Sequence, residues 1–367
     1  MNIVLLCGSL SYAGAQRQLF ELAKGLNEKH QVIVCSISSN VPLLQDFKSN
    51  NVRVEVFGLR KRNFVKIIRG LNKLLISNKI QVVYSFLETA NTYSRIMKFL
   101  IPGIKIVASE RSSDNKINFR AKLLEKSLSK VTDLYIANSY AGKKALRKNY
   151  NIKKVKVIHN GIDKDRFLSG KKSSLNSQLG RNIIISQIGR IKPDKNYEMF
   201  LKVAEKVCEL HKDVVFLAIG DQPNSKDAYQ KIILKEKSKL KNKDRILFIG
   251  KRSDIPEILS ETDVSILTSH REGCSNTVLE SMFAKCPIVV TDVGDNKIML
   301  SEANQDFIVK PDDVADMVKK ISILIDDLDL RKRIGNENYK KAQKEFTKEM
   351  MVENTESVIS TLLETDI

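Results

Sequence analysis

The sequence predicts an α/β protein of two Rossmann-like, doubly wound domains that face each other across a cleft. The chain of 367 residues is longer than a single hydrophobic core usually supports. Short apolar runs alternate with apolar residues at helical spacing, which is typical of a mainly parallel sheet covered on both faces. This alternation is interrupted over residues 160–181 and then restarts. We therefore expect an N-terminal domain at residues 1–165, a C-terminal domain at 166–347, and a last helix at about 348–367 that packs back on the first domain.

The first domain opens with a strand over residues 3–7, a loop that contains Gly8 and Gly14, and a helix that runs to residue 26. The glycine spacing differs from the G-x-G-x-x-G fingerprint, so a dinucleotide site is not predicted. Gly8 and Gly14 could let an acceptor approach the backbone closely, or they could only shape the turn. Further strands are expected at 31–37, 52–57, 81–86, 105–108, 134–138 and 155–158.

Positive charge is concentrated in this first half. The formal net charge is +19, and residues 1–170 contain 30 Lys and Arg against 11 Asp and Glu. Two predicted helical stretches, 64–77 and 116–130, combine an apolar stripe with many basic residues. The apolar residues are Phe64, Ile67, Ile68, Leu71, Leu74 and Leu75 in the first stretch and Ile117, Leu123, Leu124 and Leu128 in the second. The basic faces are either solvated surface or a surface that rests on anionic lipid headgroups, and both can hold together.

The second domain repeats the alternation of strands and helices. A strand at 182–188 leads into a polar loop at 189–196 and a helix that runs to residue 210. Later strands are expected at 214–219, 245–249, 264–267, 287–291 and 307–309, and the chain is helical from about residue 313.

The most informative stretch is 269–280, which follows the predicted strand 264–267. Gly273 permits a tight turn, and Ser275 or Asn276 is a good N-cap for the helix that follows. A strand, a polar turn and a helix N-terminus at the carboxyl end of a parallel sheet favour an anionic ligand. Two carboxylates, Glu272 and Glu280, would repel a bare phosphate but suit a ligand that also carries sugar hydroxyls. The alternative is a solvated helix start with Glu280 exposed.

Other features exclude whole classes of protein. No run of about 18 apolar residues is present, so a membrane-spanning helix is not predicted. Residues 1–8 are better interpreted as a strand than as a signal peptide. The five cysteines lack paired spacing, which favours reduced thiols in the cytoplasm and argues against a metal site. We expect a cytoplasmic protein, peripheral on the inner face of the membrane.

Several motifs occur in a characteristic order. They are residues 158–163, Gly189-Arg190 with Lys195-Asn196, Gly220-Asp221, residues 248–250, Glu272 with Glu280, and residues 287–294. In this order they resemble the retaining glycosyltransferases of family 4, which have the two-domain GT-B fold. The resemblance spans essentially the whole chain.

The resemblance implies the transfer of a hexose or N-acetylhexosamine from a nucleotide diphosphate sugar, with UDP as the commonest carrier. It implies retention of anomeric configuration and no metal or other cofactor. Arg190 and Lys195 would stabilise the departing diphosphate, Glu272 would contact the transferred sugar, and Glu280 would hold the ribose hydroxyls. The nucleotide base would lie near residues 250–254. The implied donor-binding residues are Gly189, Arg190, Lys195, Gly250, Gly273, Ser275, Asn276, Thr277 and Glu280.

The chain departs from the family in one place. Many members carry a histidine after the fifth strand, where this chain has Ser109, Glu110, Arg111 and Ser112. This variant resembles members that build bacterial surface polysaccharides or lipid-linked oligosaccharides. We expect Gly14, Glu110 and Arg111 on the acceptor side, although Glu110 and Arg111 could instead form a surface ion pair. The acceptor would be a membrane-held saccharide such as a polyprenyl-diphosphate-linked oligosaccharide.

Two other functions compete with this one. An isomerase of the same fold, such as a nucleotide-sugar epimerase, would act on the donor alone. A nucleic-acid-binding protein would use the +19 charge, but the basic helices lack interleaved surface aromatic residues and a recognition motif, so no nucleic-acid partner is expected.

Overall fold

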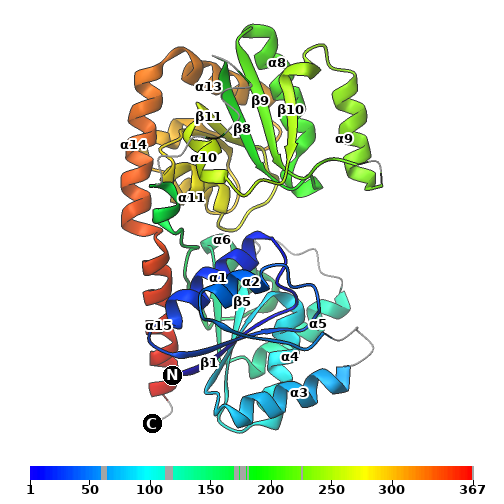
Figure 1. Cartoon of the computed structure of the whole chain (residues 1–367), viewed down its shortest axis with the longest axis vertical. Coiled ribbons are helices and arrows are strands. Elements are labelled where there is room, and N and C mark those ends of the chain that lie inside the picture. Colours follow the sequence, from blue (N-terminus) through cyan, green and yellow to red (C-terminus); the bar gives the residue numbers. More distant parts are fainter. Residues whose placement is uncertain are drawn as a thin grey trace. The chain divides into compact units, whose positions relative to one another are not determined.

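The computed structural model describes the chain except residues 59–63, 112–118, 169–172, 174–178, 180–181, 225 and 366–367. It contains two compact α/β units, one comprising Met1–Gly161 with Lys348–Ile367 and the other comprising Ile162–Thr347 (Figure 1). The chain enters the second unit at Ile162, whose N–H donates to the carbonyl of Phe346 at 2.9 Å. The division therefore lies a few residues before the expected boundary at 165. Half of the expected linker lies outside the described residues, as do Arg60, Lys61, Arg62, Ser112 and Ile117.

The first unit is built on a seven-stranded sheet in which every neighbouring pair is parallel, in the order β3-β2-β1-β4-β5-β6-β7. The strands are β1 (Asn2–Cys7), β2 (Gln31–Ser36), β3 (Arg53–Val56), β4 (Val82–Phe86), β5 (Lys105–Glu110), β6 (Leu134–Ala137) and β7 (Val155–Val157). Because β1 lies between β2 and β4, the loops after β1 and β4 diverge there, which makes the carboxyl edge of this sheet a natural ligand site.

Helices cover both faces of this sheet because its strands are apolar on both faces. The helices are α1 (Gly14–Leu26), α2 (Leu44–Ser49), α3 (Phe64–Ser77), α4 (Leu87–Leu100), α5 (Phe119–Leu128), α6 (Tyr140–Tyr150) and α15 (Lys348–Glu364), with a 3₁₀ turn at Ser129–Val131. Helices α1 and α15 pack with Ile3 and Leu5 on one face. Helices α3 and α4 pack with Val4 and Leu6 on the other.

The last helix, α15, packs against α1 within the first unit (Figure 1). Met351, Val352 and Ile359 are buried in the same hydrophobic cluster as α1. Glu356 forms an ion pair with Lys29 at 3.3 Å and a hydrogen bond with the His30 ring at 3.0 Å. Apolar burial and these polar contacts together hold α15 on this unit.

The second unit contains a six-stranded parallel sheet in the order β10-β9-β8-β11-β12-β13. The strands are β8 (Ile183–Gly189), β9 (Val214–Gly220), β10 (Ile246–Gly250), β11 (Val264–Leu267), β12 (Ile288–Thr291) and β13 (Ile308–Val309). The strand order reverses between β8 and β11, so their following loops leave in opposite directions and open a crevice at the carboxyl edge.

The helices of this unit are α8 (Tyr197–Leu210), α9 (Ala228–Ser238), α10 (Ile255–Ser260), α11 (Asn276–Phe283), α12 (Asn296–Met299), α13 (Val314–Asp326) and α14 (Leu328–Glu345). Short 3₁₀ helices are η3 (Lys164–Phe167), η4 (Pro193–Lys195), η5 (Lys243–Arg245) and η6 (Glu302–Phe307). None of the helices in the described part of the chain has the length and hydrophobicity that crossing a bilayer requires.

Two apolar residues that the helical pattern assigns to a buried stripe are exposed. Phe64 is 44% exposed because it is the first residue of α3. The centre of its ring lies 5.2 Å from the centre of the Tyr93 ring of α4. Leu123 of α5 is 57% exposed. The prediction for Phe64 is wrong because a periodic pattern does not show where the packed part of a helix begins, whereas Ile67, Leu71 and Leu75 are buried as expected.

Candidate functional site

The crevice between β8 and β11 lies within the second unit and begins where β8 meets β9. Gly220 ends β9 with φ +151°, and a Cβ atom there would lie 2.3 Å from the carbonyl oxygen of Gly189. Only glycine allows this close approach of two backbones. The next residue, Asp221, accepts a hydrogen bond from the N–H of Ile191 at 3.0 Å. These contacts fix the loop that carries Arg190 and Lys195.

Lys195 and Glu272 meet across this crevice. The Lys195 Nζ lies 2.5 Å from the Glu272 Oε1, and the Ser269 hydroxyl donates to the same oxygen at 2.7 Å. The Lys195 and Glu272 side chains are 21% and 10% exposed. The Oε2 atom of Glu272 has no hydrogen-bond partner among the described residues. One oxygen of Glu272 is therefore held by the protein, and the other remains available to a hydroxyl group.

The backbone around Lys195 is held by several hydrogen bonds. The Thr268 hydroxyl lies 3.0 Å from the carbonyl oxygen of Lys195 and 2.9 Å from Gln187 Oε1. The His270 N–H donates to the Asp194 carbonyl at 2.9 Å. Asn196 has left-handed backbone angles, and its side chain caps α8 by accepting from the Met199 N–H at 3.2 Å. The backbone that carries Lys195 is thus held by contacts from Gln187 of β8, from the segment after β11 and from the start of α8.

The turn that carries Glu272 and Gly273 depends on a second glycine. Gly294, with φ +60°, follows β12, and a Cβ atom there would lie 2.5 Å from the Glu272 carbonyl oxygen and 2.6 Å from that of Gly273. The next N–H, from Asp295, donates to the Gly273 carbonyl at 3.0 Å. Gly294 therefore lets the loop after β12 pack directly against the backbone of the turn at Glu272 and Gly273. The sequence motif did not assign this role to Gly294.

Helix α11 points its N-terminus into this crevice. Ser275 is the N-cap residue, as one of the two expected candidates, but its side chain makes no cap hydrogen bond. The Thr277 hydroxyl donates to the carbonyl of Ile188 at 3.1 Å, which holds the first turn of α11 against the end of β8. The Ser275 side chain does not cap α11. The positive end of the helix dipole at this position favours an anion.

Arg190 and Glu280 flank this helix end. Arg190 is exposed and has no hydrogen bond or ion pair among the described residues. Glu280 is the fifth residue of α11, and its Oε1 atom lies 3.8 Å from the guanidinium of Arg166 in η3. Arg166 precedes the second sheet by many residues, and nothing in its local sequence marks it as part of the site.

The expected base-binding segment starts after β10. Gly250 has φ +71°, and a Cβ atom there would lie 3.3 Å from the Gln222 amide oxygen. Arg252 and Asp254 form two hydrogen bonds at 2.8 and 2.5 Å. The Arg252 guanidinium lowers the pKa of the Asp254 carboxyl below its ordinary value. This pair shapes the loop and leaves the Asp254 carboxylate charged at neutral pH.

The residues expected on the acceptor side lie at the carboxyl edge of the first sheet. Gly14 begins α1, Glu110 ends β5 and Arg111 follows it. Arg111 donates to the Asn160 Oδ1 at 2.8 Å, and its guanidinium stacks on the ring of Phe86 at 4.5 Å. Arg111 is thus in contact with Asn160 and Phe86. They hold the guanidinium next to the end of β4.

The five cysteines are all buried with free thiols. Burial raises the pKa of Cys208 to about 11, and it also raises the pKa of Cys7, Cys35 and Cys286. Thiols with raised pKa values are poor nucleophiles and metal ligands at neutral pH. Among the described residues, no group of three His, Cys, Asp or Glu side chains is arranged to hold a metal ion.

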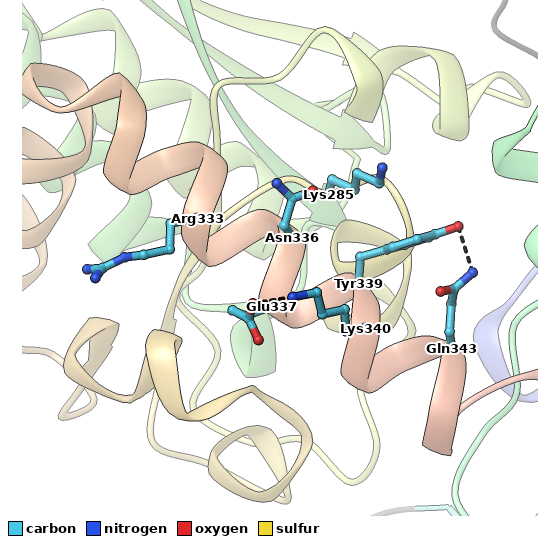
Figure 2. Close-up of a pocket in the computed structure, with 7 residues that line it drawn as sticks. All are labelled: Lys285, Arg333, Asn336, Glu337, Tyr339, Lys340 and Gln343. Carbon is cyan, nitrogen blue, oxygen red and sulfur yellow. Dashed lines mark hydrogen bonds and ion pairs between the residues drawn. The ribbon is translucent and has the colours of Figure 1, made fainter.

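A separate surface pocket of about 450 Å³ lies along α14 (Figure 2). It is lined by Lys285, Arg333, Asn336, Glu337, Tyr339, Lys340 and Gln343. Lys340 pairs with Glu337 at 2.7 Å, and the Lys285 ammonium lies 4.7 Å from the centre of the Tyr339 ring. Lys285 precedes β12, whereas the crevice lies after β11 and β12, so the pocket is at the opposite edge of the sheet from Lys195 and Glu272.

The comparisons with known proteins agree with this architecture. The family described as Glycosyl transferases group 1 matches residues 171–341, and Glycosyltransferase Family 4 matches residues 12–166. The chain is 27% identical over 340 residues to the UDP-Gal:alpha-D-GlcNAc-diphosphoundecaprenol alpha-1,3-galactosyltransferase of Escherichia coli, covering 86% of this chain and 85% of that protein.

A Campylobacter jejuni protein is 24% identical over 364 residues and covers 94% of each chain. It is the GalNAc-alpha-(1->4)-GalNAc-alpha-(1->3)-diNAcBac-PP-undecaprenol alpha-1,4-N-acetyl-D-galactosaminyltransferase. The structure of Anabaena Alr3699/HepE in complex with UDP-glucose superimposes with a TM-score of 0.86 at 19% identity, covering 98% of this chain and 100% of that one. This last likeness establishes the shared fold.

The two family matches together extend over most of the chain, in the order and at the positions of its two α/β units. The chain is therefore a glycosyltransferase of the GT-B fold and belongs to glycosyltransferase family 4.

Proposed function

We propose that this glycosyltransferase moves a hexose or N-acetylhexosamine from a UDP-sugar to a saccharide carried on a polyprenyl diphosphate, in the synthesis of a surface polysaccharide or related glycan. The donor part rests on one observation: Lys195, Glu272 and the N-terminus of α11 all lie where the strand order reverses. The acceptor part is supported by the Escherichia coli and Campylobacter jejuni relatives, whose names specify undecaprenol-linked acceptors.

The proposed chemistry follows from charge. Cleavage of the bond between the sugar and the diphosphate leaves negative charge on the diphosphate, which must be stabilised as it develops. In the proposed mechanism Arg190, which has no partner among the described residues, and Lys195 supply cations. The backbone from Gly273 to Thr277 supplies N–H donors at the N-terminus of α11. Gly189 and Gly250 let the donor approach the backbone of the loops after β8 and β10.

Glu272 and Glu280 would recognise hydroxyl groups. The Oε2 atom of Glu272 is the part of that carboxylate that can accept a hydroxyl of the transferred sugar while Oε1 keeps Ser269. Glu280 would accept the ribose hydroxyls, with Arg166 at 3.8 Å holding the carboxylate. Asn276 and Thr277 would lie between these two positions, next to the phosphates. Gly14, Glu110 and Arg111 would bind the acceptor.

We further propose that the reaction retains the anomeric configuration and needs no divalent metal or other cofactor. Two cations and a helix end supply at the diphosphate the positive charge that a metal ion would otherwise bring. The basic first unit would bring the enzyme to an anionic membrane surface where the acceptor is held, as a peripheral protein of the inner face, with no nucleic-acid partner.

The donor is tested by thermal shift with UDP, GDP and ADP and with UDP-glucose, UDP-galactose and their N-acetyl forms. A ligand that binds the native state raises the melting temperature by mass action. We expect UDP and at least one UDP-sugar to raise it, and EDTA to leave both the shift and turnover unchanged. Proton NMR of the product then reports the anomer. Formation of an epimer from the donor without acceptor would contradict transfer and favour an epimerase.

A further inference from the structure

The outward side of α3 combines exposed basic side chains with exposed apolar ones. Ile67, Leu71 and Leu75 of α3 are buried against the sheet, and the opposite side faces away from it (Figure 1). At about 100° per residue, five exposed side chains fall within an arc of about 100° on that opposite side. They are Val65, Lys66, Arg69, Lys73 and Ile76, which we call the α3 outer face.

The charges of the α3 outer face are uncompensated. The side chains of Lys66, Arg69 and Lys73 form no hydrogen bond or ion pair within the described part of the chain. The helix contains no acidic residue at all. On ordinary solvated helices basic residues are commonly matched by acidic ones three or four positions away, as Lys340 and Glu337 are on α14. The α3 outer face therefore presents an unbalanced positive field.

The same face exposes two branched apolar side chains. Val65 and Ile76 are each 58% exposed, and at about 1.5 Å per residue they lie about 16 Å apart along the helix. A single exposed apolar residue needs no explanation. Val65 and Ile76 lie on the same side of the helix, with three cationic residues between them along its length. This arrangement suits a helix at a membrane interface, where apolar side chains lie below the headgroups and cations lie among the phosphates.

We propose that the α3 outer face is the membrane-contacting surface of this enzyme and that its partner is an anionic lipid bilayer. Val65 and Ile76 enter the interface, while Lys66, Arg69 and Lys73 bind headgroup phosphates. The purpose of this contact rests on the proposed function, because it brings the first unit to a lipid-carried acceptor. Charge complementarity selects anionic over zwitterionic lipid, since each basic residue near such a surface contributes about 1 kcal/mol.

The first experiment measures partition onto vesicles. Wild-type protein is sedimented with phosphatidylglycerol–phosphatidylcholine vesicles and with pure phosphatidylcholine vesicles, over a range of salt. We expect binding to the anionic vesicles only, weakening with salt. The triple variant Lys66→Gln, Arg69→Gln, Lys73→Gln should bind on the order of a hundredfold more weakly, the sum of three such contacts.

A matched control is available on α14, where Lys332, Arg333 and Lys344 are also exposed and have no ion pair among the described residues. The variant Lys332→Gln, Arg333→Gln, Lys344→Gln removes the same charge and the same side-chain types from the other unit. We expect it to bind anionic vesicles like the wild type. An equal loss in both variants would show that only net charge matters and would overturn the assignment to α3.

The second experiment uses the absence of tryptophan from the chain. Val65→Trp or Ile76→Trp places a single fluorophore on the α3 outer face, and Leu210→Trp places one at a site that is 65% exposed on the second unit. On anionic vesicles the emission of the first two should shift to shorter wavelength and that of the third should not. Absence of a shift at both α3 positions in vesicle-bound protein would overturn the proposal.

Two outcomes separate this inference from its alternatives. If the protein binds duplex DNA with steep salt dependence and does not bind anionic vesicles, the basic surface serves nucleic acid and the proposal fails. UDP binding does not involve α3. If UDP produced no thermal shift, this would count against the proposed function and would leave the vesicle result intact. If the wild-type protein binds UDP but does not bind anionic vesicles, only the α3 assignment is refuted.

Discussion

The ammonium group of Lys195 lies 2.5 Å from the Oε1 atom of Glu272, and this pair joins the loop after β8 to the loop after β11. The two residues are 77 positions apart in the chain. Each is held by further hydrogen bonds, at the Lys195 carbonyl by Thr268 and at the Glu272 carboxylate by Ser269. The pair lies where the strand order reverses, so the features expected of a donor site meet at one point of the second unit.

Replacing Lys195 should slow the reaction rather than only weaken binding. We expect Lys195→Ala, and likewise Arg190→Ala, to lower turnover by about a hundredfold or more, because each removes positive charge from the departing diphosphate. Lys192→Ala is the control, since Lys192 is on the same loop but pairs with Asp227 at 2.7 Å. Steady-state kinetics with a UDP-sugar separate kcat from KM. Near-normal kcat in both Lys195→Ala and Arg190→Ala would remove their proposed role.

Glu280 should matter only when the nucleotide carries ribose hydroxyls. We expect Glu280→Ala to weaken UDP binding by about ten- to a hundredfold, the loss of hydrogen bonds to a charged acceptor. It should leave the weaker binding of 2′,3′-dideoxy-UDP unchanged. Isothermal titration with both nucleotides measures this difference. Arg166→Ala controls for the ion pair at 3.8 Å, and an equal loss for both nucleotides in Glu280→Ala would contradict ribose recognition.

Gly294→Ala should damage both stability and UDP binding. A Cβ atom at Gly294 would lie 2.5 Å from the Glu272 carbonyl oxygen, whereas at Gly58, with nearly the same φ of +63°, such a Cβ would have no atom of the described residues within 4 Å. Gly58→Ala therefore carries only the cost of the left-handed backbone, about 1 to 2 kcal/mol. Urea denaturation and UDP titration compare the two variants. If both lose the same stability and neither loses UDP affinity, the contact with the turn at Glu272 has no consequence.

Arg95 should be essential to the stability of the first unit. Its side chain is fully buried and forms two hydrogen bonds of 2.7 Å with Glu125, with further bonds to Tyr135 and Thr132. We expect Arg95→Ala to cost about 3 to 5 kcal/mol, because it breaks a buried ion pair and its network. Arg53→Ala, which breaks the exposed pair with Glu55 at 2.8 Å, should cost less than about 1 kcal/mol. Equal urea midpoints for the two variants would contradict this.

Cys208 should make the protein less stable in alkali. Burial raises the pKa of its thiol from an ordinary 9.0 to about 11. Between these values the unfolded chain has lost the proton and the folded chain still holds it, so the free energy of unfolding falls as pH rises through this range. The decline should be steeper in the wild type than in Cys208→Ala, as measured by urea denaturation from pH 8 to 11. Parallel curves would show that the thiol titrates alike in both states.

Much of the fold could be predicted from the sequence because local patterns decide it. Apolar runs and helical repeats place the strands of both sheets within a few residues, since burial on both faces requires apolar residues throughout a parallel strand. Arg190, Lys195, Glu272 and Glu280 could be selected because they stand in a motif beside predicted strand ends. Their roles remain predictions for the experiments above.

Other features depend on contacts between distant segments and could not be predicted. No local pattern shows that Gly294 lies against Glu272, that Arg166 approaches Glu280, or that the Ser275 side chain does not cap α11. The exposure of Phe64 also depends on where α3 leaves the sheet. The sequence alone determined the elements and the residue types available for chemistry, because periodicity and composition act locally. Only the tertiary structure decided which of these groups meet, because strand order brings together residues that are far apart in the chain.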